Sequence, residues 1–284
     1  MRLMRVGPPG GERPAVMGRD GVPRDISSII PDLSPPHLER IDIVRALLSS
    51  DPAALPPIPP GSRTGPCVGA PGKIVCIGYN SKAHTSQMGR PGGGDGGLMV
   101  FLKPLSALSG PNDPIPYPRC ARKLDWEAEL AVVIGTKGKY IGEGEAAAHI
   151  LGYTCFNDLS DRFWQFETDD SQFTKGKGFD GFAPAGPYLV TPDEAGDPSD
   201  LAVRLWVNGE LRQDFRTSDY RLGACGVVSY LSRFFTLHPG DLIAMGSGPG
   251  NAKSWGGDAF LRPGDAVALE IDTLGRQEQI VVCG

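Results

Sequence analysis

Short apolar runs, separated by glycine- and proline-rich stretches, follow one another along most of the chain after residue 72. The clearest run spans 124–134, while 201–207 alternates apolar and polar residues before Asn208-Gly209, a pair that favours a tight hairpin turn. Helical spacing is confined to short segments such as 143–150 and 227–235. Many short strands with few helices predict a mainly β, α+β fold, arranged as a barrel or a roll. Further strands are expected over 73–78, 98–102, 152–157, 241–245 and 266–271.

The segment 1–72 differs from the rest because it is rich in proline. Residues 16–17 and 25–26 are candidate short strands around the turn at Arg19-Asp20-Gly21, and 41–48 has helical spacing. Four prolines between 56 and 60 indicate an extended connector. The sequence therefore predicts a small N-terminal subdomain with a proline-rich connector over 1–72, and a larger domain over 73–284.

Composition and charge narrow the class of protein. The net charge is −5 and no basic stripe is present, which argues against a nucleic-acid partner. No apolar run approaches the roughly 18 residues of a transmembrane helix, so no membrane partner is expected. The six cysteines form no Cys-x-x-Cys pair and are expected to be free, mostly buried thiols in a reducing compartment, which favours the cytoplasm. The four histidines lack the spacing of a zinc site.

Two glutamates lead into the clearest predicted strand. Glu127 and Glu129 are two residues apart, and side chains at that spacing point to the same face of a strand. The apolar run 131–134 is expected to be buried on both faces, so adjacent carboxylates would repel each other and would be costly to desolvate. A hard divalent cation, which prefers carboxylate oxygen, would offset that cost. The alternative is an exposed strand face with two hydrated glutamates.

Three further side chains lie next to predicted strands or glycines. Asp158 follows the strand over 152–157 and is a candidate third carboxylate, or else the residue of an Asx-turn or helix cap. Lys177 stands between two glycines, where backbone can approach a ligand closely; the alternative is an ordinary loop lysine. His84 follows another strand, ahead of a glycine-rich loop, and is either a residue of a lid over a site or a surface histidine.

These pieces together resemble the fumarylacetoacetate hydrolase superfamily, from about Lys73 to Val282. The resemblance depends on the order and spacing of several motifs rather than on a single one. They are Lys73-Ile-Val-Cys-Ile-Gly-Tyr-Asn80 with His84, Phe101-Leu-Lys-Pro104, Leu124-Asp-Trp-Glu-Ala-Glu-Leu130, Asn157-Asp158 with Arg162 and Gln165, Gly176-Lys-Gly-Phe-Asp180, Trp206-Val-Asn-Gly-Glu210 and Pro239-Gly-Asp241.

The resemblance implies the mixed β roll of that superfamily, with a small N-terminal part, in a protein that is usually a homodimer. It implies that Glu127, Glu129 and Asp158 hold Mg²⁺ or Mn²⁺ (Ca²⁺ in a crystal) and that Lys177 lies beside the metal. Arg162 and Gln165 fall at positions that contact a bound 2-oxo acid in the family, and His84 falls at the position of the general base on the lid. A 2-oxo or β-diketo acid would then react through a metal-bound enolate.

The sequence departs from the usual family pattern at three places. Gln87 stands where hydrolytic members usually carry a glutamate three residues after the lid histidine, and a neutral amide cannot anchor an imidazolium as a carboxylate does. The loop 244–250 replaces a Thr-Gly-Thr-Pro-type sequence, and Ser247 is a candidate source of the missing hydroxyl for substrate binding. Phe163 and Trp164 are expected to make the pocket entrance more apolar.

Three interpretations of function follow from the resemblance. The first is hydrolytic cleavage of a C–C bond in a 2-oxo or β-diketo acid. The second is an isomerase, tautomerase or decarboxylase acting on a similar acid, which the Gln87 substitution favours. The third is a member that binds metal and ligand without turnover, against which the intact carboxylates and Lys177 argue. The glycine-rich residues 89–97 are expected to become ordered with the lid when substrate binds.

Overall fold

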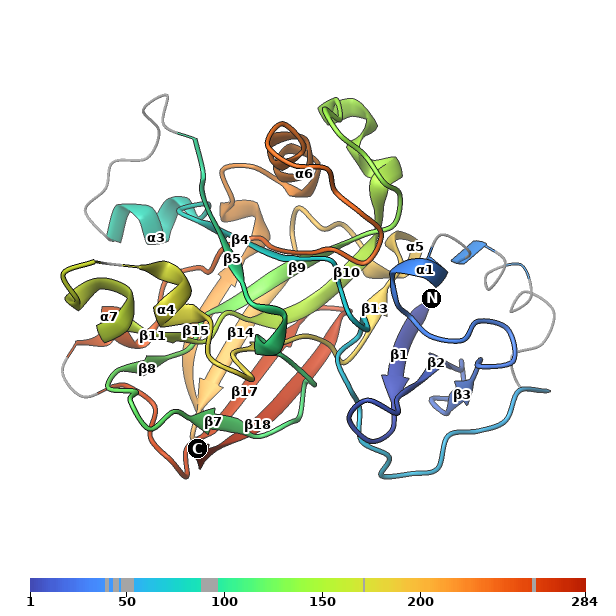
Figure 1. Ribbon diagram of the computed structural model, residues 1–284, viewed down its shortest axis with the longest axis horizontal. Helices are drawn as coiled ribbons and strands as arrows, with labels where there is room; N and C mark the ends of the chain where they lie inside the picture. Colours follow the sequence, from blue (N-terminus) through green and yellow to red (C-terminus); the bar gives the residue numbers. More distant parts are fainter. Residues whose placement is uncertain (39–40, 43–45, 47–53, 88–96, 171, 257–258) are drawn as a thin grey trace.

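The computed structural model describes residues 1–38, 41–42, 46, 54–87, 97–170, 172–256 and 259–284. Two β-sheets form its frame (Figure 1). The larger sheet has nine strands in the order β3-β2-β1-β13-β10-β9-β16-β4-β5. Their bounds are Pro23–Asp25 (β3), Arg13–Met17 (β2), Arg2–Val6 (β1), Leu189–Val190 (β13), Ile150–Asn157 (β10), Ala128–Ile134 (β9), Leu242–Ala244 (β16), Ile74–Gly78 (β4) and Met99–Lys103 (β5).

The second sheet has five strands in the order β15-β14-β17-β18-β7. Their bounds are Glu210–Arg216 (β15), Ala202–Val207 (β14), Ala266–Ile271 (β17), Gly275–Cys283 (β18) and Ile115–Tyr117 (β7). Strands β14 and β15 meet at Asn208-Gly209, whose φ angles of 51° and 80° lie in the left-handed region that this type of hairpin turn requires. Two small pairs complete the strands: β8 (Leu124–Asp125) with β11 (Ser160–Asp161), and β6 (Leu108–Ser109) with β12 (Ala183–Pro184).

Strand β9 lies between two hydrophobic cores. Its alternate residues Leu130, Val132 and Ile134 belong to the larger core, together with side chains of β14 and β17 from the second sheet. Ala131 and Val133 belong to the other core, together with Leu3 of β1. All seven residues of β9 are buried, which explains why its sequence from Leu130 onward is a continuous apolar run rather than an alternating one.

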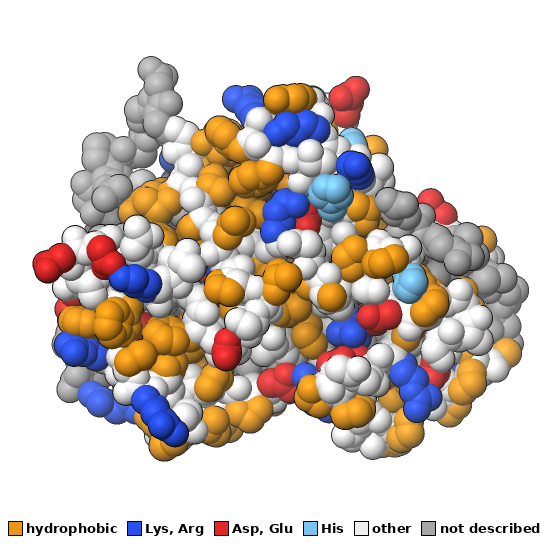
Figure 2. All heavy atoms as spheres, in the orientation of Figure 1, with side chains coloured by type: hydrophobic (Ala, Val, Ile, Leu, Met, Phe, Trp, Pro, Cys, Tyr) orange, Lys and Arg blue, Asp and Glu red, His pale blue; other side chains and the backbone are white. Residues whose placement is uncertain are grey.

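The helices are short and lie around the sheets. Figure 1 shows α3, α4 and α7 gathered at one end of the molecule, while β1, β2 and β3 lie at the other. On the face seen in Figure 2, acidic and basic side chains are interspersed rather than gathered by sign. The helical segments that lie fully within the described residues are α1 (Pro35–Leu38), α3 (Lys82–Gln87), η2 (Leu105–Ala107), η3 (Glu143–His149), η4 (Phe163–Glu167), α4 (Phe173–Lys177), α5 (Pro192–Ala195), η5 (Thr217–Asp219), α6 (Ala224–Ser232) and α7 (Ala252–Trp255).

The mainly β, α+β fold is confirmed, as a roll of two open sheets rather than a closed barrel. The N-terminal strands β1, β2 and β3 extend the large sheet through the antiparallel pairing of β1 with β13. The division into 1–72 and 73–284 stays a prediction. Most of the helix expected over 41–48, and residues 89–96 of the expected lid loop, lie outside the described residues. Among the described helices, none is long and apolar enough to cross a membrane.

Two expectations need correction. The single strand over 124–134 is divided into β8 and β9, because Trp126 and Glu127 between them follow a different backbone path. The six cysteines are free, but only Cys67, Cys76 and Cys155 are buried, whereas Cys120 and Cys283 are exposed. Neither exposed cysteine belongs to a hydrophobic core: Cys120 lies in a turn, and Cys283 is the last residue of β18, at the edge of the strand's buried part.

Candidate active site

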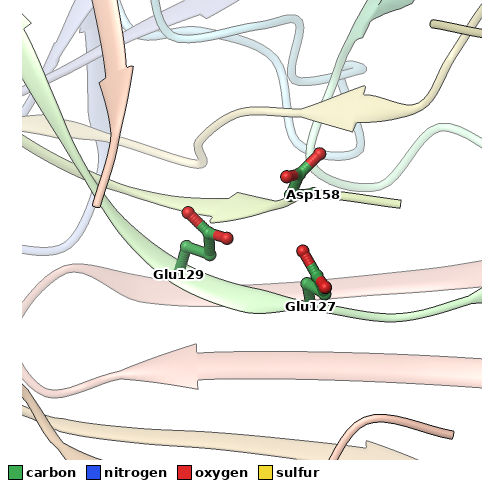
Figure 3. A group of neighbouring side chains, drawn as sticks. All are labelled: Glu127, Glu129 and Asp158. Atoms are coloured by element: carbon green, nitrogen blue, oxygen red, sulfur yellow. The ribbon is translucent and has the colours of Figure 1, made fainter. Parts of the chain in front are cut away.

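Three carboxylates meet where β9 begins and β10 ends (Figure 3). The antiparallel register places Ala128 opposite Asn157, so the flanking Glu127 and Asp158 become neighbours, and the Asp158 amide donates to the Glu127 carbonyl at 2.9 Å. Oxygen atoms of Glu127, Glu129 and Asp158 lie within 4.8 Å of one another. The three side chains are buried, with exposures of 8%, 1% and 1%. Figure 3 shows the carboxyl groups pointing toward a common centre.

Three side chains, two of them from distant segments, hold the backbone around Glu127. The Glu127 amide donates to Asn157 Oδ1 at 3.0 Å, and the Ala128 amide donates to Gln213 Oε1 at 2.9 Å. The Trp126 amide donates to the carboxylate of Asp125 at 2.8 Å. Because these amides are bonded to side chains instead of to a neighbouring strand, the chain leaves the sheet at this point. Glu127 and Glu129 still converge, although Glu127 is not itself a strand residue.

Two buried lysines lie against the carboxylates. Lys177, the last residue of α4, donates to Glu127 Oε2 and Asp158 Oδ2 at 2.7 Å each, and to Ser160 Oγ at 2.8 Å. Lys103, the last residue of β5, forms an ion pair with Asp158 Oδ1 and donates to the Leu159 carbonyl at 3.0 Å. These lysines offset part of the negative charge that the fold concentrates here.

Arg162 joins the carboxylate group to the residues around it. Its guanidinium donates to Asp125 Oδ2 at 2.7 Å, to Glu127 Oε1 at 2.6 Å and to Gln165 Oε1 at 2.8 Å. Buried, charge-assisted hydrogen bonds of this kind fix the orientation of both partners. Arg162 therefore sets the position of Glu127 and Gln165, in addition to lining the cavity described below.

The charges act differently on the two glutamates. Burial favours the protonated form of Glu127, but Arg162 and Lys177 outweigh it and hold the pKa of Glu127 well below its usual range. Burial, together with the charges of Asp158 and Glu127, raises the pKa of Glu129 well above its usual range. Burial also lowers the pKa of Lys103. A cation next to Glu129 would favour its charged form and so oppose the rise in its pKa.

A single cavity contains most of the residues expected from the sequence. Among the described residues, its lining includes the three carboxylates together with Lys177, Arg162, Gln165, Ser247 and His84. Gln87 is the last residue of α3, and its side chain lies outside the part of the chain that the structure describes. The structure thus brings together eight of the nine candidate residues, which lie far apart in the sequence.

The apolar wall of the cavity differs from the one expected. Phe101, Phe166 and Phe173 line it, with ring centroids 5.3 Å apart for Phe101–Phe173 and 5.5 Å apart for Phe166–Phe173. The prediction for Phe163 and Trp164 is wrong. Arg122 packs over the ring of Phe163, and the Trp164 indole donates to the Cys120 carbonyl at 2.8 Å. Both rings lie on the side of η4 that faces the 120–122 turn.

His84 reaches the cavity from α3. Ser81 precedes the helix, and its hydroxyl accepts from the His84 amide at 3.0 Å, as expected for an N-cap residue. Asp219 accepts from the Ser81 hydroxyl and, at 3.1 Å, from the Ala83 amide. The side chain of His84 is half-buried. The start of α3 is therefore tied to the η5 segment, and this tie sets where His84 stands.

The loop 246–253 is bonded to the same segment that carries the carboxylates. The Gly246 amide donates to Glu129 Oε2 at 2.7 Å, and the Ala252 amide donates to Asp125 Oδ1 at 2.6 Å. Gln213 of β15 donates to Ser247 Oγ at 2.9 Å and to the Gly248 carbonyl at 3.1 Å. This loop, which departs from the usual family sequence, is thus held by its backbone as well as by Ser247.

Sequence reasoning assigned no role to four residues that shape the site: Lys103, Asp125, Ser160 and Gln213. Lys103 and Asp125 lie inside motifs that carry the family resemblance, and these positions are what could have identified them as site residues from the sequence. Ser160 follows Asp158 by two residues. Gln213 lies in an exposed-looking strand, and only the tertiary structure shows that it is buried.

The residues present fit a hard divalent cation. The donor set consists of three carboxylates, which is the ligand type that Mg²⁺ and Mn²⁺ prefer. Glu127 and Asp158 contact lysine or arginine, whereas Glu129 accepts from the Gly246 amide. The raised pKa of Glu129 has its cause in burial and in like charges, and a cation at the common centre relieves both.

Comparisons with known proteins identify the family to which the chain is similar. A family model described as Fumarylacetoacetate (FAA) hydrolase C-terminal matches residues 73–282. The 2,4-didehydro-3-deoxy-L-rhamnonate hydrolase of a Sphingomonas species is 40% identical over 282 residues, which are 99% of this chain and 96% of that protein.

Solved structures extend the comparison. The maleylpyruvate hydrolase from Sphingobium sp. SYK-6, in complex with manganese (II) ion and pyruvate, aligns with a TM-score of 0.83 and 30% identity over 100% of both chains. The 5-carboxymethyl-2-hydroxymuconate delta-isomerase from Mycobacterium smegmatis aligns with a TM-score of 0.79 and 32% identity, over 100% of this chain and 99% of that chain. The similarity covers the whole chain and includes proteins named for hydrolysis and for isomerisation.

Proposed function

The chain belongs to the fumarylacetoacetate hydrolase family, and we propose that it is a divalent-metal-dependent enzyme that cleaves a C–C bond in a 2-oxo or β-diketo acid. It is an enzyme, since its relatives are named hydrolases and isomerases. The observation that carries the proposal is the group of three buried carboxylates, which shares one cavity with Lys177 and His84. A relative at 30% identity holds manganese and pyruvate, a 2-oxo acid, and this supports the same ligand classes here.

Different residues of the cavity would bind the metal, stabilise negative charge and bind the substrate. Glu127, Glu129 and Asp158 would hold Mg²⁺ or Mn²⁺, and a bound cation supplies a Lewis acid that stabilises negative charge on substrate oxygens. Lys177 keeps an ammonium group 2.7 Å from two of these carboxylates, next to the place where that charge develops. Gln165 and Ser247 offer an amide and a hydroxyl to the acid end of the substrate, and Arg162 keeps Gln165 in place.

His84 is the candidate general base of the hydrolytic reaction. Its imidazole accepts a proton from water, and the resulting hydroxide adds to the distal carbonyl carbon. The bond between that carbon and the neighbouring carbon then breaks, and the electron pair moves to the 2-oxo fragment, which is later protonated. The distal fragment leaves as a carboxylic acid, so one water molecule is consumed in each turnover.

Isomerisation, tautomerisation or decarboxylation of a similar acid is the second candidate. Gln87 favours it, because an amide at that position stabilises an imidazolium less than a carboxylate does and so weakens His84 as a base for water. The isomerase at 32% identity supports this alternative. The carboxylates and Lys177 serve each of these reactions equally well, so they do not distinguish between them.

A substrate panel followed by NMR tests the proposal. The panel contains acylpyruvates, oxaloacetate, a fumarylacetoacetate-like diketo acid, maleylpyruvate and 2,4-didehydro-3-deoxy-L-rhamnonate, each with Mg²⁺ or Mn²⁺. We expect two acid fragments from at least one diketo substrate, and we expect excess chelator to abolish their formation. Loss of CO₂ or a shifted double bond without cleavage would select the second candidate. Full activity in excess chelator would refute metal dependence.

We also propose that the protein is cytoplasmic and forms a homodimer, as the family resemblance implies. The free thiols support a reducing compartment. Light scattering coupled to size-exclusion chromatography checks the oligomeric state, for which we expect twice the chain mass of 30.2 kDa.

A further inference from the structure

Lys103 is a fully buried lysine to which the proposed reaction assigns no role. Its side chain is 0% exposed, and its ammonium contacts Asp158 Oδ1 and the Leu159 carbonyl, the latter at 3.0 Å. A buried charge is costly unless it is paired and hydrogen-bonded, and Lys103 meets both conditions at one of the candidate metal ligands.

The register of β5 aims Lys103 at the site. Side chains two residues apart on a strand share a face, so Met99, Phe101 and Lys103 point the same way. Met99 and Phe101 line the cavity, while Leu102, between Phe101 and Lys103, is 46% exposed on the opposite face. Three side chains of β5 therefore point toward the site, and Lys103, the last residue of the strand, is the most deeply buried of them.

Each carboxylate oxygen of Asp158 contacts a different lysine. Lys103 takes Oδ1, whereas Lys177 takes Oδ2 at 2.7 Å and also contacts Glu127 Oε2 at 2.7 Å. Oδ2 is thus the oxygen on the side shared with Glu127. Lys177 bridges two carboxylates as a cation between them would, while Lys103 contacts only Asp158 among the three.

We propose, on the basis of the metal-dependent function above, that Lys103 is a positioning residue: it holds Asp158 by Oδ1 and so keeps Oδ2 turned toward Glu127 and the cation. Without Lys103, Oδ1 loses its charged partner inside the protein, and Asp158 is no longer restrained in that orientation. Residues that orient metal ligands in this way commonly change metal affinity by about 10- to 100-fold when they are replaced.

If Lys103 positions Asp158, replacing it should weaken cation binding, whereas the loss of its charge alone would strengthen it. Removing a positive charge beside a cation site strengthens cation binding by Coulomb's law. Loss of orientation weakens it. We therefore expect Lys103→Met to bind Mn²⁺ at least about tenfold more weakly than the parent. Lys177→Met removes an equal charge from the same carboxylate, but that lysine occupies the bridging place, so this variant is expected to bind Mn²⁺ as tightly as the parent or more tightly.

The experiment titrates the full chain, stripped of metal by chelator and dialysis, with Mn²⁺ and follows free Mn²⁺ by electron paramagnetic resonance. Leu102→Ser, on the outer face of the same strand, is the control for general damage to β5 and should bind normally. Lys103→Arg keeps a charged donor for Oδ1 and is expected to retain most of the affinity. Melting curves by circular dichroism check folding, and Lys103→Gln replaces Lys103→Met if that variant does not fold.

The outcomes separate this inference from the function on which it rests. A parent protein that binds no Mn²⁺ would refute the metal-dependent function itself. A parent that binds Mn²⁺, with a folded Lys103→Met or Lys103→Gln variant that binds it equally or more tightly, would overturn the role of Lys103 alone. Equal weakening in the Lys103 and Lys177 variants would also overturn it, because the effect would then not depend on which oxygen of Asp158 each lysine holds.

Discussion

The cavity has two sides that are built in different ways. On one side, Glu129 and its neighbours lie on or beside β9 and β10, in the interior of the large sheet, and nearly every polar group is bonded to a charged partner or a backbone amide. On the other side, His84 lies on α3, a helix of six residues that is tied to η5 through Ser81 and Asp219. His84 is half-buried, whereas Glu129 is 1% exposed.

From this contrast we infer that the strand side binds the cation and the helix side supplies the base. The strand side concentrates negative charge, offsets part of it with Lys103, Lys177 and Arg162, and leaves a place for a cation. The helix side brings the imidazole of His84 to the same cavity, while the three carboxylates that could hold a cation all belong to the strand side. Substitutions on the strand side should therefore affect cation binding and, with it, every reaction. Substitutions on the helix side should change which reaction occurs and leave cation binding intact.

The largest effect is expected from Glu127→Ala. It removes one candidate metal ligand and leaves Arg162 and Lys177 without a shared carboxylate partner. Because a Lewis-acid cation stabilises the transition state by several kcal/mol, turnover should fall by about a thousandfold or more. Steady-state assays and Mn²⁺ titration measure both consequences. Glu145→Ala, an exposed residue of η3, is the matched control. Near-normal turnover in Glu127→Ala would remove this residue from the site.

The next effect is expected from His84→Ala, which tests the helix side. Loss of a general base typically slows a reaction by about 100-fold or more, so C–C cleavage should fall by that factor. The Mn²⁺ affinity should stay at the parent value, because His84 lies outside the carboxylate group. His149→Ala on η3 controls for loss of an imidazole elsewhere. If cleavage is unchanged in His84→Ala, His84 is not the base; if metal binding is lost as well, the two sides are not independent.

A pH dependence of cation binding follows from the strand side. The pKa of Glu129 is raised by burial and by the charges of Asp158 and Glu127, so below that raised pKa a cation must displace a proton from Glu129. The pKa of Glu127 is lowered, so Glu127 is already ionised and does not contribute. Mn²⁺ affinity should therefore rise with pH, by up to about tenfold per pH unit for one released proton, and level off above the pKa of Glu129.

Calorimetry in buffers of different ionisation enthalpy measures this released proton directly. An affinity that is constant from mildly acidic to mildly alkaline pH would contradict a protonated Glu129 in the metal-free protein. Repeating the titration with His84→Ala should give the same pH dependence, since the helix side does not hold the cation.

The smallest effect is expected from Gln87→Glu on α3. A carboxylate three residues after His84 stabilises the imidazolium and should raise the rate of hydrolysis, by about three- to tenfold if its contribution is about 1 kcal/mol, as for partly exposed ion pairs. Isomerisation and decarboxylation should not gain by the same factor. Product ratios from the NMR panel give this comparison. A Gln87→Glu protein with an unchanged product ratio would show that the amide is not what limits water attack.

The sequence predicts the strands well where each depends on local pattern. Strand β14, its hairpin with β15 and the buried run of β9 follow from alternation, from the Asn208-Gly209 turn and from a continuous apolar stretch. The interruption at Trp126 and Glu127 could not be predicted in this way. It depends on acceptors from Asn157 and Gln213, which reach it only in the folded chain.

In the candidate site, too, contacts between residues far apart in the sequence could not be predicted. The three carboxylates, Lys177 and His84 were found through their motifs, and the fold places them in one cavity. Lys103 lies in the Phe101-Leu-Lys-Pro104 motif, but its partner Asp158 is 55 residues away, so nothing local indicates the ion pair. The error over Phe163 and Trp164 has a related cause. The sequence shows aromatic residues near Arg162, but not which side of η4 each one occupies.

On the strand side, we propose that a divalent cation lies between Glu127, Glu129 and Asp158. Anomalous X-ray diffraction from crystals grown with Mn²⁺ and a 2-oxo acid tests it most directly, because it locates the metal without reference to activity. We expect an anomalous peak within coordination distance of an oxygen of each of these three carboxylates, at about 2.0–2.3 Å, with the 2-oxo acid on its open side. No peak at this position in a crystal that contains Mn²⁺ elsewhere, or a peak that lacks two of the three carboxylates as ligands, would contradict it.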